Sequence, residues 1–253
     1  MKKPSLIAAS MLGVALVMPQ MTDLRAAELR VLAGGSTTGW LNELAPQFER
    51  ATGHKLIIHF DSTPNLIKQA AFGAPLDLAV VPVDVFKDAA ARARFVTGPT
   101  VDIARVGYGV IVRASAPRPD VSTPDALRKT LLDAPSIAFV PESAAGAYVL
   151  KTFDRLGIAE AMRAKTRPQG TPAQIAPAVA KGEAELGVFL INVLTAPGVE
   201  LAGPFPAELQ QELVFTAAVA ADSKEADAAK AFISFLTTPA SAAVIKAKGM
   251  NPG

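Results

Sequence analysis

The sequence contains no cysteine and only two histidines. The absence of cysteine excludes disulfides and thiolate chemistry. The two histidines, His54 and His59, fall in one expected strand region, which makes a histidine-rich metal site a poor prediction. We therefore expect neither a metal nor another cofactor.

Charge of one sign is not in excess either. Lysine and arginine total 25 against 23 acidic residues, for a net charge of +2, and the basic residues are scattered along the chain. A nucleic-acid partner would favour a basic stripe, so none is expected. Any bound anion must be met by a local site.

Long apolar runs are also absent beyond the N-terminus, so no membrane insertion is expected once that segment is removed. Lys2 and Lys3 precede an apolar run from Leu6 to Met18, which has the length found in a secretory signal. We expect a signal peptide over residues 1–27, cleaved near "LRAAE" after Ala26 or Ala27, and export to the periplasm. An uncleaved N-terminal anchor is the alternative. Removal leaves roughly 225 residues, enough for one large or two modest domains.

What the mature chain does contain is an alternation of Val/Ile/Leu-rich strands with helical patterns. Strands are expected at "ELRVLAG", "KLIIHF", "LDLAVVP", "SIAFV" and "AELGVFLI", with helices between them, including one around Val85 to Phe95. This alternation predicts an α/β architecture with largely parallel sheets.

Hydroxyl residues stand at two of the strand-to-helix junctions. Ser36 and Thr37 follow the first strand, and Ser62 and Thr63 follow the second. The first turn of a helix has unpaired N–H groups and a partial positive charge, which suits an anion. Plain capping without a ligand is the alternative. Two such junctions in neighbouring parallel units would share the carboxyl edge of one sheet, where ligands of open α/β sheets bind.

The order of the segments predicts two discontinuous lobes. The chain would leave lobe I near Val106 to Val112, build lobe II, and return near Gly203 to Val219. The expected lobes are 28–107 plus 203–253 and 108–202. A cleft between two such lobes can close on a small solute by hinge motion.

Several segments together resemble the periplasmic molybdate-binding proteins of ABC importers. They are the two hydroxyl junctions and the phrases "GAPLDLAVVP", "AAGAY", "KGEAELGV" and "AFISFLTTPASAAVIKAKG". The resemblance covers nearly all of the mature chain and implies the type II periplasmic binding-protein fold. It also implies a monomer that binds a small anionic solute and works with an ABC permease.

The resemblance implies a site of hydroxyls and backbone N–H groups. Ser36 and Thr63 match the hydroxyls of that family, and Ala145, next to Gly146, matches a residue that gives a backbone N–H. A further N–H donor falls at Pro172, which has none, and a tyrosine aligns with Leu190. A shift of one residue would bring in Thr171 or Phe189 instead. Two lost donors could cost roughly 1 to 3 kcal/mol each, so the solute is either a molybdate-like oxyanion or a small carboxylate.

The phrase "GVELAGPFPAELQ" resembles the branch of this family that includes an aconitate isomerase. Interconversion of trans- and cis-aconitate needs a base for an allylic proton and cations for the carboxylates. Asp61, His59, Glu142 and Tyr148 are the candidate bases, and Arg105 is the candidate carboxylate clamp. Other polar residues considered for the anion are Arg113, Arg167, Gln169 and Lys68. A sensor built on the same fold is a third possibility.

Overall fold

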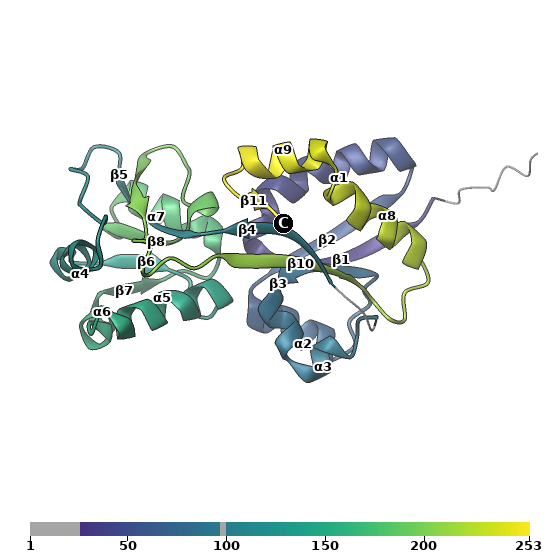
Figure 1. Cartoon of the computed structure of the whole chain (residues 1–253), viewed down its shortest axis with the longest axis horizontal. Helices are drawn as coiled ribbons and strands as arrows, with labels where there is room; N and C mark the ends of the chain where they lie inside the picture. Colours follow the sequence, from purple (N-terminus) through teal and green to yellow (C-terminus); the bar gives the residue numbers. More distant parts are fainter. Residues whose placement is uncertain (1–25, 97–99) are drawn as a thin grey trace, which may run out of the picture.

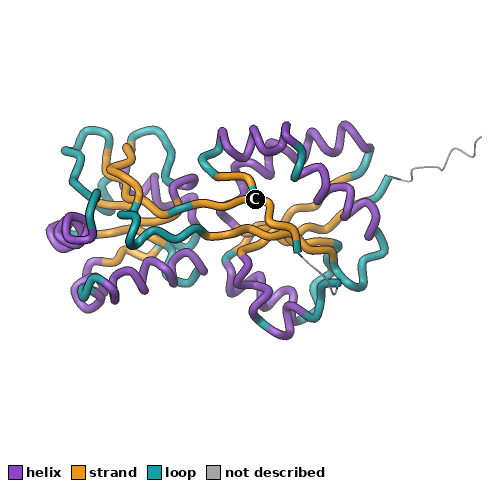
Figure 2. Tube along the Cα trace, viewed as in Figure 1, coloured by secondary structure: helices purple, strands orange, loops and turns teal. Residues whose placement is uncertain are grey.

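The computed structural model describes residues 26–96 and 100–253. Most of the expected signal peptide therefore lies outside the described residues. The chain forms two lobes with separate sheets (Figure 1). The expectation of a two-lobe α/β fold is confirmed, because each lobe is a sheet with helices on its faces (Figure 2).

The lobe that begins the described chain holds a six-stranded sheet in the order β11-β4-β10-β3-β1-β2. Its strands are β1 (Glu28–Gly34), β2 (Lys55–Asp61), β3 (Leu78–Pro82), β4 (Val101–Val106), β10 (Leu213–Val219) and β11 (Asn251–Pro252). β1 pairs in parallel with β2 and β3, whereas β10 runs antiparallel to β3 and β4. The carboxyl ends of β1 and β2 consequently meet at one edge.

Helices cover both faces of this sheet (Figure 1). The α-helices are α1 (Thr38–Thr52), α2 (Thr63–Ala71), α3 (Ala89–Arg92), α8 (Ala226–Leu236) and α9 (Pro239–Ala247), with 3-10 turns η1 (Gly35–Thr37) and η2 (Val83–Lys87). Trp40, Leu41, Leu44 and Phe48 of α1 are buried, as the apolar spacing predicts. Gly53 closes α1 with a φ of 77°, in the left-handed region that favours glycine.

The second lobe holds a five-stranded sheet in the order β7-β6-β8-β5-β9. Its elements are β5 (Tyr108–Arg113), α4 (Pro124–Asp133), β6 (Ile137–Phe139), α5 (Ala144–Arg155), α6 (Ala159–Lys165), β7 (Thr166–Pro168), η3 (Pro172–Gln174), α7 (Ile175–Lys181), β8 (Leu186–Leu190), η4 (Ile191–Val193) and β9 (Val199–Pro204). β6 is parallel to β7 and β8, and β5 is antiparallel to β8 and β9.

Two segments connect the lobes. Gly107 separates β4 from β5, and residues 205–212 join β9 to β10. The Gln210 side chain ties the segments together, because its Oε1 accepts from Tyr108 N at 2.8 Å and its Nε2 donates to Tyr108 O at 2.9 Å. A Cβ at position 107 would lie 3.0 Å from Gln210. The expected lobe boundaries stay a prediction; β9 carries the second sheet to Pro204.

The expectation of largely parallel sheets is wrong, because both sheets mix parallel and antiparallel pairs. The structure also differs from the expected elements. The helix expected around Val85 to Phe95 is divided into η2 and α3, with Asp88 as the cap between them. The sequence patterns also missed α6, β7 and β11. Within residues 26–96 and 100–253, no single helix is long and apolar enough to cross a membrane, and α8 with α9 meets that test only as a pair bent by 62°.

Candidate functional site

A cavity of about 280 Å³ lies between the lobes, and both lobes contribute to its wall. Four strand-to-helix junctions reach it, after β1, β2, β6 and β7. Its lining residues are Gly34, Gly35, Ser36, Thr38, Phe60, Asp61, Ser62, Thr63, Pro82, Val140, Ser143, Ala145, Gly170, Thr171, Pro172, Ala173, Phe189, Leu213 and Phe215. The structure therefore brings together Ser36, Ser62, Thr63 and Ala145, which come from three of these junctions.

The first junction presents Ser36 but not Thr37. Ser36 is 7% exposed and lines the cavity, and its hydroxyl has no hydrogen-bond partner among the described residues. Thr37 is fully buried, and its Oγ1 donates to Gly34 O at 2.7 Å. Thr37 is thus buried away from the cavity. Thr38, which the sequence analysis did not select, lines the cavity instead.

Neither of the first two junctions uses its hydroxyls as helix caps. The N-cap positions of η1, α1 and α2, which are Gly34, Thr37 and Ser62, make no side-chain cap hydrogen bond. The alternative of plain capping is therefore not observed at these positions. Ser36 and Ser62 keep hydroxyl groups free to bind another molecule.

The second junction also contacts the other lobe. Thr63 is 7% exposed, and its Oγ1 accepts a hydrogen bond from Ala144 N at 3.2 Å. A hydroxyl that accepts one hydrogen bond still has its own proton to donate. Thr63 can therefore hold an anion oxygen while it joins the two lobes.

The third junction presents Ala145 rather than Gly146. Ser143 caps α5, because its Oγ accepts from Gly146 N at 2.9 Å, and this occupies the Gly146 N–H. Gly146 does not line the cavity, and a Cβ there would lie 1.9 Å from Val140 O. Gly146 is thus required by the close passage of the chain before α5, whereas Ala145 faces the cavity.

The fourth junction has few donors to offer. Gln174 Oε1 accepts from Gly170 N at 2.9 Å and from Thr171 N at 3.0 Å, and Pro172 has no N–H. Thr171 and Phe189 line the cavity, whereas Leu190 is fully buried and faces Tyr108 in the sheet register. Pro172 and its neighbour Thr171 thus both reach the cavity, whereas at the other position Phe189 reaches it and Leu190 does not.

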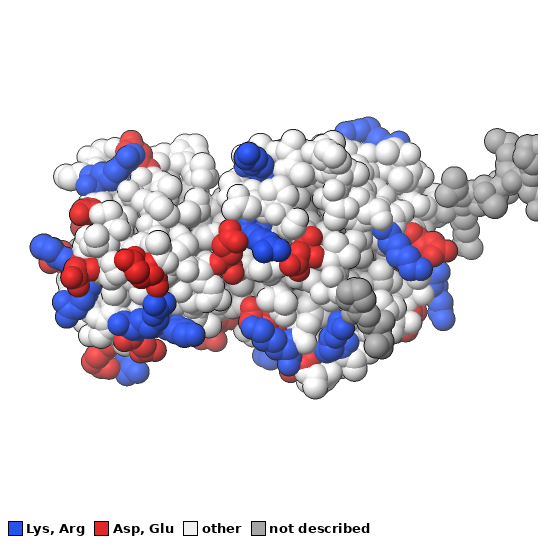
Figure 3. All heavy atoms as spheres, in the orientation of Figure 1, with Lys and Arg blue, Asp and Glu red and all other residues white. Residues whose placement is uncertain are grey.

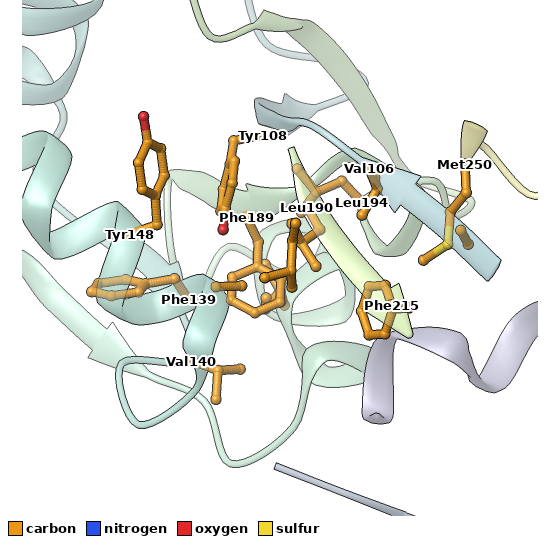
Figure 4. Close-up of a cluster of buried hydrophobic side chains, with 14 of the residues drawn as sticks. Val106, Tyr108, Phe139, Val140, Tyr148, Phe189, Leu190, Leu194, Phe215 and Met250 are labelled. Atoms are coloured by element: carbon orange, nitrogen blue, oxygen red, sulfur yellow. The ribbon is translucent and has the colours of Figure 1, made fainter. Parts of the chain in front are cut away.

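One side of the cavity is apolar. Phe60, Phe189, Phe215, Val140 and Leu213 line it, and Figure 4 shows Val140, Phe189 and Phe215 in the buried cluster that continues from this wall. Such side chains offer no hydrogen bond to an oxygen. These side chains can therefore cover a hydrocarbon part of a bound anion but do not bind its oxygens.

The described residues that line the cavity include no lysine, arginine or histidine, and Asp61 is their one carboxylate. Partial burial raises the pKa of Asp61, but hydrogen bonds from the Asn65 side chain, Ser62 N and His59 together outweigh this and leave the pKa lowered. Asp61 also accepts from Gln69 Nε2 at 2.9 Å. It is thus a partly buried carboxylate whose charged form is stabilised by hydrogen bonds, which makes it a weak base.

The other candidate residues lie away from the cavity wall. His59 contacts Asp61 with 3.4 Å between Nε2 and Oδ2, and Arg105 pairs with Asp102 at 3.3 Å. The Tyr148 hydroxyl donates to Leu209 O at 2.8 Å. The remaining candidates that do not line it are Lys68, Arg113, Glu142, Arg167 and Gln169. Arg105 lies on β4 beside β11 and is not placed to clamp a carboxylate in this cavity.

Comparison with known proteins agrees with this architecture. A family model described as bacterial extracellular solute-binding protein matches residues 29–251. The chain belongs to this solute-binding family. A relative named aconitate isomerase from Pseudomonas sp. is 32% identical over 88% of this chain and 87% of its own. A molybdate-binding protein from Azotobacter vinelandii is 30% identical over 89% of this chain and 90% of its own.

A solved structure supports the fold of this family member. The periplasmic molybdate-binding protein of Azotobacter vinelandii superposes with a TM-score of 0.73 at 23% identity, over 88% of this chain and 98% of the other. The family model and the two relatives confirm the resemblance to molybdate-binding proteins and to a branch with an aconitate isomerase. No group of three or more His, Asp or Glu residues that could hold a metal occurs in the described part of the chain.

Proposed function

We propose that this member of the solute-binding family is a periplasmic binding protein of an ABC importer that takes a small anion into its interlobe cavity. The observation that carries the proposal is the meeting of Ser36, Ser62, Thr63 and Ala145 on one cavity. Hydroxyls and helix starts can hold an anion without a cationic side chain. The ligand is a molybdate-like oxyanion or a small carboxylate.

The proposal includes a mature periplasmic protein, released after cleavage near Ala26 or Ala27, that acts as a monomer with a permease and without a cofactor. The assignment of 28–107 plus 203–253 and 108–202 to the lobes belongs to it. On the face in Figure 3, basic and acidic side chains are interspersed, and no large area of one sign is seen. The anion would then be recognised by the groups that line the interlobe cavity and not by a charged surface.

Titration calorimetry of the mature protein against molybdate, tungstate, sulfate, citrate and both aconitates tests the proposal. At least one anion should bind, and it should raise the melting temperature by mass action. Ser36→Ala should lower the affinity for that anion, whereas Ser234→Ala, on α8 outside the cavity, should leave it unchanged. Equal affinity of the two variants would remove Ser36 from the site, and no binding of any anion would reject the function.

A second function is favoured by one relative and by the apolar part of the cavity wall. The relative at 32% identity is named aconitate isomerase, and the apolar side of the cavity fits a carbon skeleton. In this alternative, the protein interconverts trans- and cis-aconitate, and Asp61 is the base candidate that reaches the cavity.

Asp61→Asn separates the two functions. Incubation of the wild-type protein with trans-aconitate, followed by chromatography, shows whether cis-aconitate forms. An isomerase would lose turnover in the variant while still binding aconitate. A receptor would show no turnover in either form, and the variant would bind the anion as tightly or more tightly, because a negative charge has left the wall.

A further inference from the structure

The interlobe cavity is larger than a tetrahedral oxyanion requires. Its volume is about 280 Å³, whereas one water takes about 30 Å³ in the liquid. A tetrahedral oxyanion has roughly the bulk of four waters, so it would leave more than half of the cavity without ligand atoms. The rest of the space must hold water or another part of the ligand.

Apolar atoms make up most of the accessible surface of this cavity. Phe60 and Phe215 come from the first sheet, and Val140 and Phe189 come from the second lobe. Figure 4 shows Val140, Phe189 and Phe215 in one buried cluster. An ordered water needs polar partners, which these side chains do not provide, whereas a hydrocarbon group gains free energy when it leaves water for such a surface.

The hydrogen-bond donors of the cavity come mainly from its first three junctions. The sheet register pairs Gly34 with Asp61, which places the first two junctions side by side, and Thr63 reaches the third through Ala144 N. The two oxygens of one carboxylate accept about four hydrogen bonds, and four groups at these junctions can donate. They are the hydroxyls of Ser36, Ser62 and Thr63 and the N–H of Ala145, none of which donates to another group within the described residues.

The fourth junction adds only a hydroxyl to this set. Gly170 N and Thr171 N both donate to the Gln174 side chain, so the backbone N–H groups there are already used. The Thr171 hydroxyl accepts from the backbone in the same capping box and keeps its proton. An anion with oxygen on every side would leave several oxygens without a donor, at a cost for each one.

The cavity also lacks a positive charge that could offset a second or third negative charge on a ligand. Its lining residues within 26–96 and 100–253 include no lysine, arginine or histidine, and Asp61 is a carboxylate among them. Each further anionic group would leave water without a counter-charge and would approach a like charge. A ligand with one negative charge therefore suits the cavity better than a dianion or a trianion.

We propose that the cavity binds a monocarboxylate with a short hydrocarbon body. The carboxylate lies at the first three junctions and accepts from Ser36, Ser62 and Thr63. The hydrocarbon body lies against the apolar part of the wall. This inference rests on the proposed function and narrows its ligand class, to which neither molybdate nor aconitate belongs.

Titration calorimetry of the wild-type mature protein with a homologous series tests this inference. The probes are acetate, propionate, butyrate and pentanoate, with succinate, molybdate and trans-aconitate as anions of higher charge. The affinity should rise about two- to fourfold for each added methylene, because each one buries more hydrocarbon. Succinate has a carboxylate where butyrate has its methyl group, and it should bind at least about tenfold more weakly than butyrate.

Phe60→Ser tests the apolar part of the wall, and Phe72→Ser is its matched control. Phe60 lines the cavity, whereas Phe72 is 87% exposed and does not. Phe60→Ser should lower the affinity for pentanoate about fivefold and the affinity for acetate less, because the longer chain loses more apolar contact. Phe72→Ser should leave both affinities unchanged.

The outcomes separate this inference from the proposed function. Equal affinities along the series would overturn the inference and leave the proposed function standing. Tighter binding of succinate, molybdate or trans-aconitate than of pentanoate would do the same. Equal effects of Phe60→Ser and Phe72→Ser would remove the apolar part of the wall from the site and also overturn it. Absence of binding by any anion to the wild-type protein would overturn both.

Discussion

Thr63 Oγ1 lies 3.2 Å from Ala144 N, although the two residues are 81 positions apart and follow strands of different sheets. The hydroxyl at the start of α2 thus meets the start of α5 across the interlobe cavity. A side chain in this place contributes both to closure of the lobes and to the wall that a ligand touches.

Thr63→Ala should weaken binding of the anion by roughly 1 to 2 kcal/mol, because the hydrogen bond to the anion and the one from Ala144 N are lost. Thr63→Ser keeps the hydroxyl and should stay within about threefold of the wild-type affinity, since only a methyl group is removed. Calorimetry checks both. If the serine variant fails as badly as the alanine variant, the methyl group and not the hydroxyl is what matters.

Asn192→Ala should weaken binding of the same anion by about 0.5 to 1.5 kcal/mol, because the hydrogen bond to Ser36 O is lost. The loss of this contact between the lobes should also favour their open arrangement. Small-angle scattering of the ligand-bound protein should show a larger radius of gyration than wild type. Asn251→Ala is the control, since Asn251 of β11 donates to Glu212, which directly precedes β10 of the same sheet. Identical scattering and affinity for wild type and Asn192→Ala would contradict a role in closure.

Arg105→Ala should leave the affinity for every anion within about twofold, because Arg105 pairs with Asp102 and does not line the cavity. The free energy of unfolding should fall by less than about 1 kcal/mol, as expected for a half-exposed ion pair. A selective loss of carboxylate binding in this variant would restore Arg105 as a clamp and show that the cleft rearranges on binding.

Asp61 should stabilise the protein only above acidic pH. Its pKa is lowered in the folded state, so its contribution is complete above the ordinary carboxyl pKa and is lost as the pH falls through the lower folded value. The difference in melting temperature between wild type and Asp61→Asn should be constant from neutral pH to about pH 5 and shrink below about pH 4. A difference that is the same at pH 3 and pH 7 would show that the hydrogen bonds do not depend on the charge.

Gly146→Ala should strongly destabilise the start of α5, because the new Cβ would meet Val140 O at 1.9 Å. Gly39→Ala is the matched control in α1, where a Cβ meets nothing within 4 Å, and should stabilise by up to about 1 kcal/mol. Chemical denaturation measures both free energies of unfolding. Similar values for the two variants would mean that the chain before α5 can move aside at little cost.

The sequence by itself determined the alternation of strands and helices, the buried face of α1 and the two-lobe order, since these follow from local apolar spacing and from glycines that only certain turns accept. It also selected Ser36, Ser62 and Thr63, and the resemblance to molybdate-binding proteins added Ala145. The sequence did not predict the short elements α6, β7 and β11. They have seven, three and two residues, and so few residues show no clear hydrophobic periodicity.

Only the tertiary structure decided which groups reach the cavity. Thr37 and Thr38 are equivalent in the sequence, and each hydroxyl donates to the carbonyl three residues back, yet Thr37 is fully buried and Thr38 lines the cavity. Thr171, Phe189 and Phe215 come from separate elements, so no local spacing relates them. The side-chain directions and the approach of the lobes are set by packing between segments that lie far apart in the sequence, so no single segment of the chain predicts them.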